Sequence, residues 1–308
     1  MVDTPDDGIE GTRRRCGFIA VIGAPNAGKS TLINRLVGAK VSIVTPKVQT
    51  TRSRILGVAR LAETQMIYVD TPGIFEPKRR LDRAMVAAAW GGAADADEVI
   101  VLIDSERGRG RDVERIVEGF KRSGRRVILA LNKVDLLRRE KLLGLAAGFD
   151  SDGVFTDTFM ISALTGDGVD DLRDDLAARL PEGTWLFPDD QLSDMNDRLF
   201  AAEITREKLF LQLRQELPYA LTVETEAWQP FENGAVRIEQ TIYVERDSQK
   251  AIVLGKQGAR IKSVREAAGT ELAEHFDRAV HLFIFVKVRD KWGDDPERYR
   301  DLGLDFNA

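Results

Sequence analysis

The sequence predicts two domains in tandem: a doubly wound α/β domain with a mostly parallel sheet, then a small α+β domain with the element order αββααβ. Three observations support this prediction. The chain has 308 residues, about twice the length of an ordinary domain. Its first half alternates short, unbroken apolar runs with helical patterns, which is typical of parallel strands covered by helices on both faces. Its second half carries two long β-patterned segments joined through Asn233-Gly234, a hairpin signal.

In the α/β domain, apolar runs predict strands at 18–22, 65–69, 99–104, 127–131 and 158–161. Helical patterns predict helices at 29–37, 81–90, 112–122 and 169–180. The first helix begins on a glycine-rich turn, and the last repeats leucine at the spacing of one buried face. Because Pro181-Glu182-Gly183 ends this helix, we place the domain at 16–183, after an N-terminal extension at 1–15.

An acidic, proline-containing stretch follows and is predicted to be a linker over 184–197. The second domain then spans 198–292. Its first helix is predicted at 197–215, ending before Pro218. The β-patterned segments lie at 220–229 and 235–246, helical segments follow at 249–254 and on to residue 276, and the last strand is predicted at 280–288. We expect the C-terminal segment, 293–308, to pack around Trp292 and Tyr299.

Composition excludes several classes of protein. The 45 basic and 50 acidic residues give a net charge of −5, which excludes a chain that is basic throughout but allows a local basic patch. One cysteine and two histidines exclude an internal disulfide and a Cys/His zinc site. No apolar run reaches the ~18 residues of a membrane span, and the acidic N-terminus lacks an apolar secretion core. We therefore expect a soluble, cytoplasmic protein.

A glycine-rich loop between the first predicted strand and helix matches the pattern G-x-x-x-x-G-K-S. We expect its backbone N–H groups and the start of the helix to converge on the β-phosphate of a nucleotide. Lys29 would neutralise β- and γ-phosphate oxygens, and the Ser30 hydroxyl would bind Mg²⁺. The residues expected to bind nucleotide here are Gly23, Ala24, Pro25, Asn26, Ala27, Gly28, Lys29, Ser30 and Thr31.

The tetrapeptide Asn132-Lys133-Val134-Asp135, directly after a predicted strand, indicates which base is bound. Asp135 can accept hydrogen bonds from N1–H and the 2-amino group of guanine, donors that adenine lacks, which favours guanine by roughly 3–6 kcal/mol. Asn132 would tie this loop to the phosphate loop, and the stem of Lys133 would cover one face of the base. Backbone N–H groups of Ser162, Ala163 and Leu164 would contact guanine O6. The expected ligands are GTP and GDP.

Two further segments are expected to sense the γ-phosphate. In the first, Asp70-Thr71-Pro72-Gly73, Asp70 would hold Mg²⁺, directly or through water, and the Gly73 N–H would contact the γ-phosphate. In the second, Gln49-Thr50-Thr51-Arg52, one threonine hydroxyl would complete the Mg²⁺ shell in the GTP state only, and we favour Thr51 over Thr50. Lys29, Thr51 and Gly73 are the expected catalytic residues. Loss of these contacts on hydrolysis would release both loops.

In this order and spacing, the five segments resemble the G1 to G5 boxes of the translation-factor-related GTPases. The residue after Gly73 is Ile74, whose apolar side chain cannot orient an attacking water, so we expect slow hydrolysis. Asn26 resembles the asparagine through which some relatives bind K⁺, and our hypothesis is that K⁺ accelerates turnover here. No arginine finger is evident. Arg52, Arg79 and Arg80 are expected to be solvated or to face RNA.

The second domain contains a G-x-x-G loop, Gly255-Lys256-Gln257-Gly258, between two predicted helices. From Ser248 to Arg265 there are five basic residues and no acidic one. With the αββααβ order, this resembles a type II KH domain, which binds about four single-stranded nucleotides in a groove with an apolar floor. That floor would comprise Ile252, Val253, Leu254 and Ile261. RNA rather than DNA is the expected ligand, bound by Gly255, Lys256, Gln257, Gly258, Arg260, Lys262 and Arg265.

Both domains together make the chain similar to the Era family of GTPases from about residue 16 to residue 306. The similarity includes Cys16-Gly17-Phe18-Ile19-Ala20, Lys47-Val48-Gln49-Thr50-Thr51-Arg52, Val286-Lys287-Val288-Arg289 and Trp292. It implies binding to the 3′ end of 16S rRNA and a role in 16S rRNA maturation and assembly of the small (30S) ribosomal subunit. It also implies weak, partly peripheral association with the inner membrane. We expect a monomer.

Two other functions are consistent with parts of this pattern. The second domain of the GTPase would bind a protein partner instead of RNA, or the chain would be a metabolic kinase that transfers the γ-phosphoryl group to a small molecule. The kinase hypothesis does not explain the tetrapeptide Asn132-Lys133-Val134-Asp135. Filter binding to single-stranded RNA at several salt concentrations separates RNA binding from protein binding, because phosphate contacts weaken steeply with salt.

Overall fold

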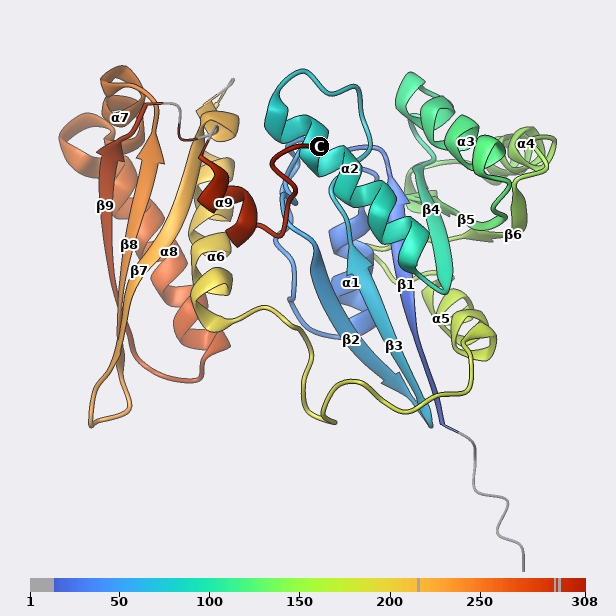
Figure 1. Ribbon diagram of the computed structural model, residues 1–308, viewed down its shortest axis with the longest axis horizontal. Coiled ribbons are helices and arrows are strands. Elements are labelled where there is room, and N and C mark those ends of the chain that lie inside the picture. Colours follow the sequence, from blue (N-terminus) through green and yellow to red (C-terminus); the bar gives the residue numbers. More distant parts are fainter. Residues whose placement is uncertain (1–13, 215–216, 291, 293–294) are drawn as a thin grey trace, which may run out of the picture.

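The apolar runs of the first half form a six-stranded sheet with the order β2-β3-β1-β4-β5-β6. The structure, a computed structural model, describes residues 14–214, 217–290, 292 and 295–308 (Figure 1). As predicted, the sheet is mostly parallel, and only β2 runs antiparallel to its neighbour, β3. The strands are β1 (Arg15–Gly23), β2 (Ile55–Leu61), β3 (Thr64–Asp70), β4 (Glu98–Asp104), β5 (Val127–Asn132) and β6 (Phe155–Met160).

Helices cover both faces of this sheet, which explains why its central strands are apolar throughout. Ile19 and Val21 of β1 pack against α1 and α5, whereas the alternating Ala20 and Ile22 belong to the core beneath α2, α3 and α4. The helices are α1 (Lys29–Val37), α2 (Arg80–Asp95), α3 (Arg111–Ser123), α4 (Arg139–Asp150) and α5 (Val169–Arg179). Among the described residues, no helix is long and apolar enough to cross a membrane.

In the first domain, three elements differ from the sequence prediction, two of them at the edges of the sheet; in the C-terminal segment, helix α9 (Pro296–Asp301) was not predicted either. The prediction missed β2, because Gly57 interrupts its apolar run. Glycine is needed there, since a Cβ atom would lie 2.8 Å from the side chain of Val37 of α1. The strand predicted at 158–161 begins three residues earlier and ends one residue earlier, as β6, because this edge strand carries exposed Thr156 and Thr158 and has no unbroken apolar run. Helix α4 was not predicted.

The second domain has the predicted order αββααβ. Its sheet has the order β7-β8-β9, with β7 antiparallel and β9 parallel to the central strand, and α6 and α8 pack on one face of it (Figure 1). The elements are α6 (Asp197–Gln212), a 3-10 turn (Leu217–Ala220), β7 (Leu221–Pro230), β8 (Val236–Val244), α7 (Asp247–Leu254), α8 (Ala259–His275) and β9 (Val280–Val288).

The segments that join the domains pack against the first domain. In the stretch predicted as a linker, the Leu192 carbonyl accepts from the N–H of Val58 at 2.8 Å, so this stretch runs along the outer edge of β2. The C-terminal helix α9 (Pro296–Asp301) returns to the first domain, where Tyr299 is buried in a cluster with Met85 of α2. Trp292 is also buried, and its Nε1 donates to the Ala220 carbonyl at 3.1 Å.

Candidate nucleotide and RNA sites

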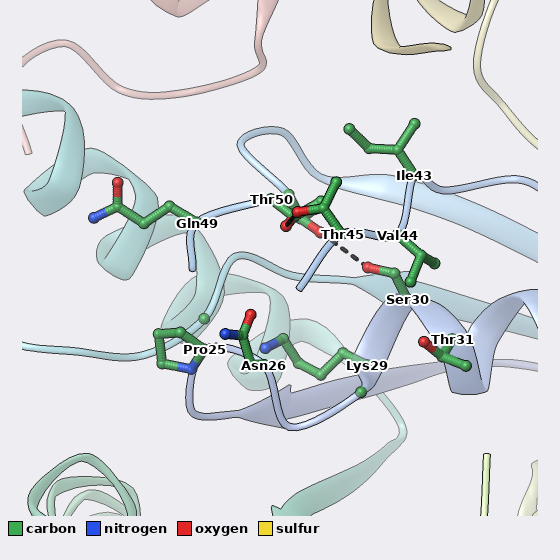
Figure 2. A pocket seen from close by; sticks show the side chains of 13 residues that line it. Pro25, Asn26, Lys29, Ser30, Thr31, Ile43, Val44, Thr45, Gln49 and Thr50 are labelled. Carbon is green, nitrogen blue, oxygen red and sulfur yellow. Dashed lines mark hydrogen bonds between the residues drawn. The ribbon is translucent and has the colours of Figure 1, made fainter. Parts of the chain in front are cut away.

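The loop between β1 and α1 is shaped by two backbone positions with positive φ, Asn26 (65°) and Gly28 (100°). A side chain at Gly28 would also collide with Nδ2 of Asn132, 2.4 Å away. Across the loop, a side chain at Gly73 would lie 2.9 Å from the backbone nitrogen of Pro25. Glycine at 73 therefore allows its segment to meet the loop at one cavity, which Figure 2 shows, and glycine at 28 allows Asn132 to pack against the loop.

Lys29 lies inside this loop rather than in solvent. Its side chain is only 7% exposed, and Nζ donates to the carbonyls of Gly23 and Ala24 at 3.2 and 3.1 Å. Burial lowers the pKa of Lys29 to about 8, and the nearby Asp70 carboxylate opposes that shift. The ammonium group is thus held by neutral carbonyls at the centre of the loop, which is where an anionic phosphate would stabilise its charge.

Three oxygen-bearing side chains that the sequence assigned to Mg²⁺ converge beside Lys29. The Ser30 hydroxyl donates to Oδ2 of Asp70 at 2.8 Å and lies 3.0 Å from Oγ1 of Thr51, which is itself 3.3 Å from the same Oδ2. The structure adds a residue that the sequence did not indicate: the Ser42 hydroxyl also donates to Oδ2, at 2.5 Å.

The other oxygen of Asp70 is a buried acceptor without a hydrogen-bond partner among the described residues. Burial raises the pKa of Asp70, against the opposing effect of its hydroxyl donors and Lys29. A buried carboxylate with one unused oxygen, next to two hydroxyls, fits a hard divalent cation such as Mg²⁺. Thr50 does not join this group, because its hydroxyl contacts that of Thr45 at 2.7 Å and donates to the Lys47 carbonyl at 2.8 Å.

A second cavity of about 520 Å³ adjoins the first and is lined by the segments that the sequence predicts to contact the base. Asn132 connects these segments: its Nδ2 donates to the Ala27 carbonyl at 2.8 Å, and its Oδ1 accepts from the N–H of Ala163 at 2.9 Å. Asp135 lines the cavity from an exposed position. Lys133 has a φ of 66° and its Nζ pairs with Asp104 at 2.5 Å, a partner that sequence reasoning missed.

The loop expected to contact guanine O6 is held from two sides. Ser162 donates its N–H to the Asp167 carbonyl at 2.9 Å, and the N–H of Ala163 is bonded to Asn132. Of the three expected donors, Leu164 therefore has the N–H without a partner in the described part of the chain. Arg35 of α1, which the sequence did not single out, donates Nε to the Ala163 carbonyl at 2.7 Å and so fixes the loop.

The switch segment, residues 40–52, is bonded to helix α6 of the second domain. The N–H of Val44 donates to Oε1 of Glu207 at 2.9 Å, and Nζ of Lys47 donates to the carbonyls of Phe210 and Leu213 at the end of α6. These contacts place the C-terminal half of α6 against the segment that carries Thr51. Figure 2 shows Thr45, Thr50 and Gln49 of this segment on the side of the cavity opposite Lys29.

The expectation that Arg52 is solvated or faces RNA was wrong. Arg52 is 4% exposed, and its guanidinium donates to the carbonyls of Leu221 and Pro218 at 2.7 and 3.0 Å. Burial, together with the nearby positive charge of Arg206, lowers the pKa of Arg52 to about 9. Arg52 is hidden because it satisfies carbonyls where β7 begins. Arg79 and Arg80 are exposed at the start of α2.

On the other side of Thr51, the Thr50 carbonyl accepts from Nη2 of Arg206 at 2.6 Å. Arg206 belongs to α6, is buried, and forms an ion pair with Glu203 one turn earlier. Both neighbours of Thr51 in the chain are thus bonded to the second domain. Local sequence patterns gave no signal for this arrangement, because it depends on two charged residues buried between domains.

The G-x-x-G loop has the backbone that its glycines allow, with positive φ at Gly255 (72°), Gln257 (50°) and Gly258 (76°). A side chain at Gly255 would lie 2.8 Å from Cβ of Arg260. The Arg260 guanidinium donates to the Ile252 carbonyl, which caps helix α7. Lys256 and Gln257 are exposed at the tip of the loop, which leaves them accessible to a ligand.

Helix α8 presents the other expected RNA-binding side chains beside this loop. Lys262 and Arg265 line a groove of about 370 Å³ together with Ile261 and the loop itself. Of the expected apolar floor, Ile261 lines this groove, whereas Val253 is fully buried in the domain core and the half-exposed Ile252 lies outside the groove lining.

Comparisons with known proteins match both halves of the chain. A family model described as "50S ribosome-binding GTPase" matches residues 18–133, and a model described as "KH domain" matches residues 216–293. GTPase Era of Rhizobium meliloti is 61% identical over 307 residues, which cover 99% of this chain and 98% of that protein. GTPase Era of Agrobacterium fabrum is 60% identical over 292 residues, which cover 95% of this chain and 92% of that protein.

Two solved structures share the whole architecture. Era in complex with MgGDPNP and nucleotides 1506–1542 of 16S ribosomal RNA matches with a TM-score of 0.89 at 38% identity, covering 94% of this chain and 99% of that one. A point variant of Aquifex aeolicus Era bound to GDP·AlF4⁻ matches with a TM-score of 0.88 at 39% identity and the same coverage. The two-domain likeness therefore extends over nearly the full length of both chains.

Proposed function

The chain belongs to the Era family of GTPases, and we propose from this that it is a switch in which GTP controls binding of single-stranded 16S rRNA during maturation of the small ribosomal subunit. The chain is a GTPase with a C-terminal KH domain. One observation carries the proposal: the segment that bears Thr51 is bonded on both sides of that residue to the second domain, by Arg206 and by Arg52.

In the nucleotide site, Ser30, Thr51 and Asp70 would hold Mg²⁺, which supplies charge stabilisation at the β- and γ-phosphate oxygens. Lys29 would exchange its two carbonyl partners for phosphate oxygens. The Gly73 N–H would contact the γ-phosphate from the opposite side. Ile74 is buried and apolar, so no side chain there orients the attacking water, and we expect slow intrinsic turnover.

K⁺ would supply further charge through Asn26. Its Nδ2 donates to the Pro46 carbonyl at 2.9 Å, while its amide oxygen has no hydrogen-bond partner among the described residues. An amide oxygen next to the phosphate loop suits a monovalent cation. We therefore propose that bound K⁺ accelerates GTP hydrolysis and that nucleotide binding does not require it.

In the second domain, RNA phosphates would lie against the N–H groups and basic side chains of the Gly255–Gly258 loop and helix α8. Support comes from the exposed Lys256 and Gln257, from the adjacent groove, and from the 16S rRNA fragment in the solved relative. Placing negative charge at both positions, Lys256→Glu with Gln257→Glu, should abolish RNA binding and leave GTP binding unchanged. Undiminished RNA affinity in this variant would contradict the site.

The link between the halves is tested by measuring RNA affinity with each nucleotide. If GTP moves Thr51 onto Mg²⁺, the attached α6 must respond, so RNA should bind more tightly with a non-hydrolysable GTP analogue than with GDP. Fluorescence anisotropy with a labelled single-stranded 16S 3′-end RNA measures both affinities. Equal affinities would refute nucleotide control, whereas absence of RNA binding in either state would favour a protein partner for the second domain.

We propose further that the chain acts as a cytoplasmic monomer on the small subunit, with a minor fraction held weakly and peripherally at the inner membrane. Light scattering after size exclusion tests the monomer. Sedimentation with vesicles that contain anionic lipid tests membrane association, and no co-sedimentation would remove that part of the proposal.

A further inference from the structure

Strand β9 exposes two phenylalanine rings on one face. Leu282 and Val286 of this strand are buried in the domain cores, and Ile284 between them packs against the same cores. The alternate residues point the other way: Phe283 is 41% exposed and Phe285 is 50% exposed. Both rings are therefore accessible to a ligand, on the strand that forms one edge of the sheet in the described part of the chain.

These two rings lie at the groove beside the G-x-x-G loop. Phe283 and Phe285 line the same groove of about 370 Å³ as Ile261, Lys262 and Arg265. The Arg237 guanidinium, from the neighbouring strand β8, lies 4.7 Å from the ring centroid of Phe283 and supports that ring from the sheet side. The groove therefore combines aromatic faces along one wall with positive charge along the other.

This combination selects one kind of ligand. An exposed aromatic row on an edge strand favours aggregation unless a partner covers it. A partner that suits both walls offers flat π faces and negative charges at short intervals, which is the chemistry of an unpaired nucleic-acid strand. The segment from Ser248 to Arg265 has no acidic residue, which disfavours a basic or purely apolar protein segment here.

We propose that Phe283 and Phe285 are stacking platforms for unpaired bases of the RNA strand whose phosphates are held by the Gly255–Gly258 loop. This inference rests on the proposed RNA-binding function and adds to it the residues that contact the bases. Stacking is tolerant of base identity, because every base has a π face. The two rings would therefore contribute affinity more than sequence selection.

The test uses the full-length protein and a single-stranded 16S 3′-end RNA that carries 2-aminopurine, whose fluorescence is quenched when the base stacks. Phe285→Ala and Phe283→Ala should each weaken binding about tenfold, within the range for loss of one base–aromatic stack. Each should also restore 2-aminopurine fluorescence in the complex. Phe285→Trp should keep both affinity and quenching, whereas Phe285→Leu, which retains apolar bulk without a π face, should lose both.

Phe231→Ala is the matched control, because Phe231 is 45% exposed on the hairpin of the same domain and does not line the groove. It should leave RNA affinity unchanged. If the wild-type protein binds no RNA, the proposed function itself fails. If the wild type binds RNA but Phe285→Ala and Phe283→Ala bind equally well with quenching intact, the stacking inference alone is overturned. Full binding by Phe285→Leu would also overturn it.

Discussion

Replacement of Arg206 by alanine should destabilise the protein strongly, because it leaves a buried carboxylate without its partner. Arg206 is 2% exposed, and its Nε donates to Oε1 of Glu203 at 2.7 Å. Glu203 is also buried, so water cannot replace the lost guanidinium. Breaking one side of a buried ion pair costs about 3–5 kcal/mol. Because Arg206 also bonds the Thr50 carbonyl, the same change should loosen the segment that holds Thr51.

A charge-free double variant separates the pair from the rest of the site. Replacing both charges by neutral residues of similar volume, Arg206→Met with Glu203→Leu, should cost less than Arg206→Ala alone, because no uncompensated charge remains. Equilibrium urea denaturation followed by circular dichroism measures the free energy of unfolding of each variant. The matched control is Lys262→Ala, which removes an exposed helix ion pair to Glu266 at 3.9 Å and should leave stability unchanged.

The result also has a functional readout. With the Thr50 carbonyl unbonded, the GTP analogue should bind more weakly in the presence of Mg²⁺, while GDP affinity should change less, because Thr51 is expected to bind the cation only in the GTP state. An Arg206→Ala variant whose free energy of unfolding is within about 1 kcal/mol of the wild type would refute the argument that the buried Arg206–Glu203 pair stabilises the fold.

Three further predictions concern the nucleotide site. Burial holds the pKa of Lys29 at about 8, and a bound phosphate should raise this pKa, so nucleotide binding should take up a proton above pH 8 and the affinity should fall as pH rises. Calorimetry in buffers of different ionisation enthalpy measures the proton uptake. A nucleotide affinity that does not change with pH would contradict this prediction. Asp135→Asn should reduce the preference for GTP over ATP by roughly 3–6 kcal/mol in competition binding, and an unchanged preference would remove Asp135 from base recognition. Turnover should be faster in K⁺ than in Na⁺ for the wild type only, with Asn26→Ala equal in both; equal wild-type rates would dispose of the K⁺ site.

Sequence reasoning succeeded where a signal is local. The bounds of α1 were predicted correctly because the glycine-rich loop precedes it and Gly38, in the left-handed region, ends it. The strand at 280–288 was also correct, since it contains the unbroken, strand-sized apolar run 282–286. The oxygen cluster of Ser30, Thr51 and Asp70 followed from motif order alone, because the carboxyl ends of parallel strands meet at one edge of a sheet.

What the sequence did not reveal depends on contacts between distant segments. Ser42 carries no motif, yet its hydroxyl reaches Asp70. Arg52 belongs to a polar run that is typical of a solvated loop, and its burial exists only because the start of β7 presents two carbonyls to it. A charged residue that is buried between domains is of the same residue type as an exposed one. The sequence pattern around it therefore does not distinguish the two cases.

The burial of these charges decides how the two domains respond to nucleotide. If Thr51 moves toward Mg²⁺, its neighbours Arg52 and Thr50 must either carry the second domain with them or break their bonds to it. Breaking them would leave the buried Arg52 guanidinium without its carbonyl acceptors, which costs several kcal/mol, and would remove one partner of Arg206, whereas moving α6 with the switch segment keeps these bonds. The second domain should therefore follow the switch. Because coupling is reciprocal, an RNA that binds one position of the second domain more tightly must raise the affinity for the matching nucleotide by the same factor.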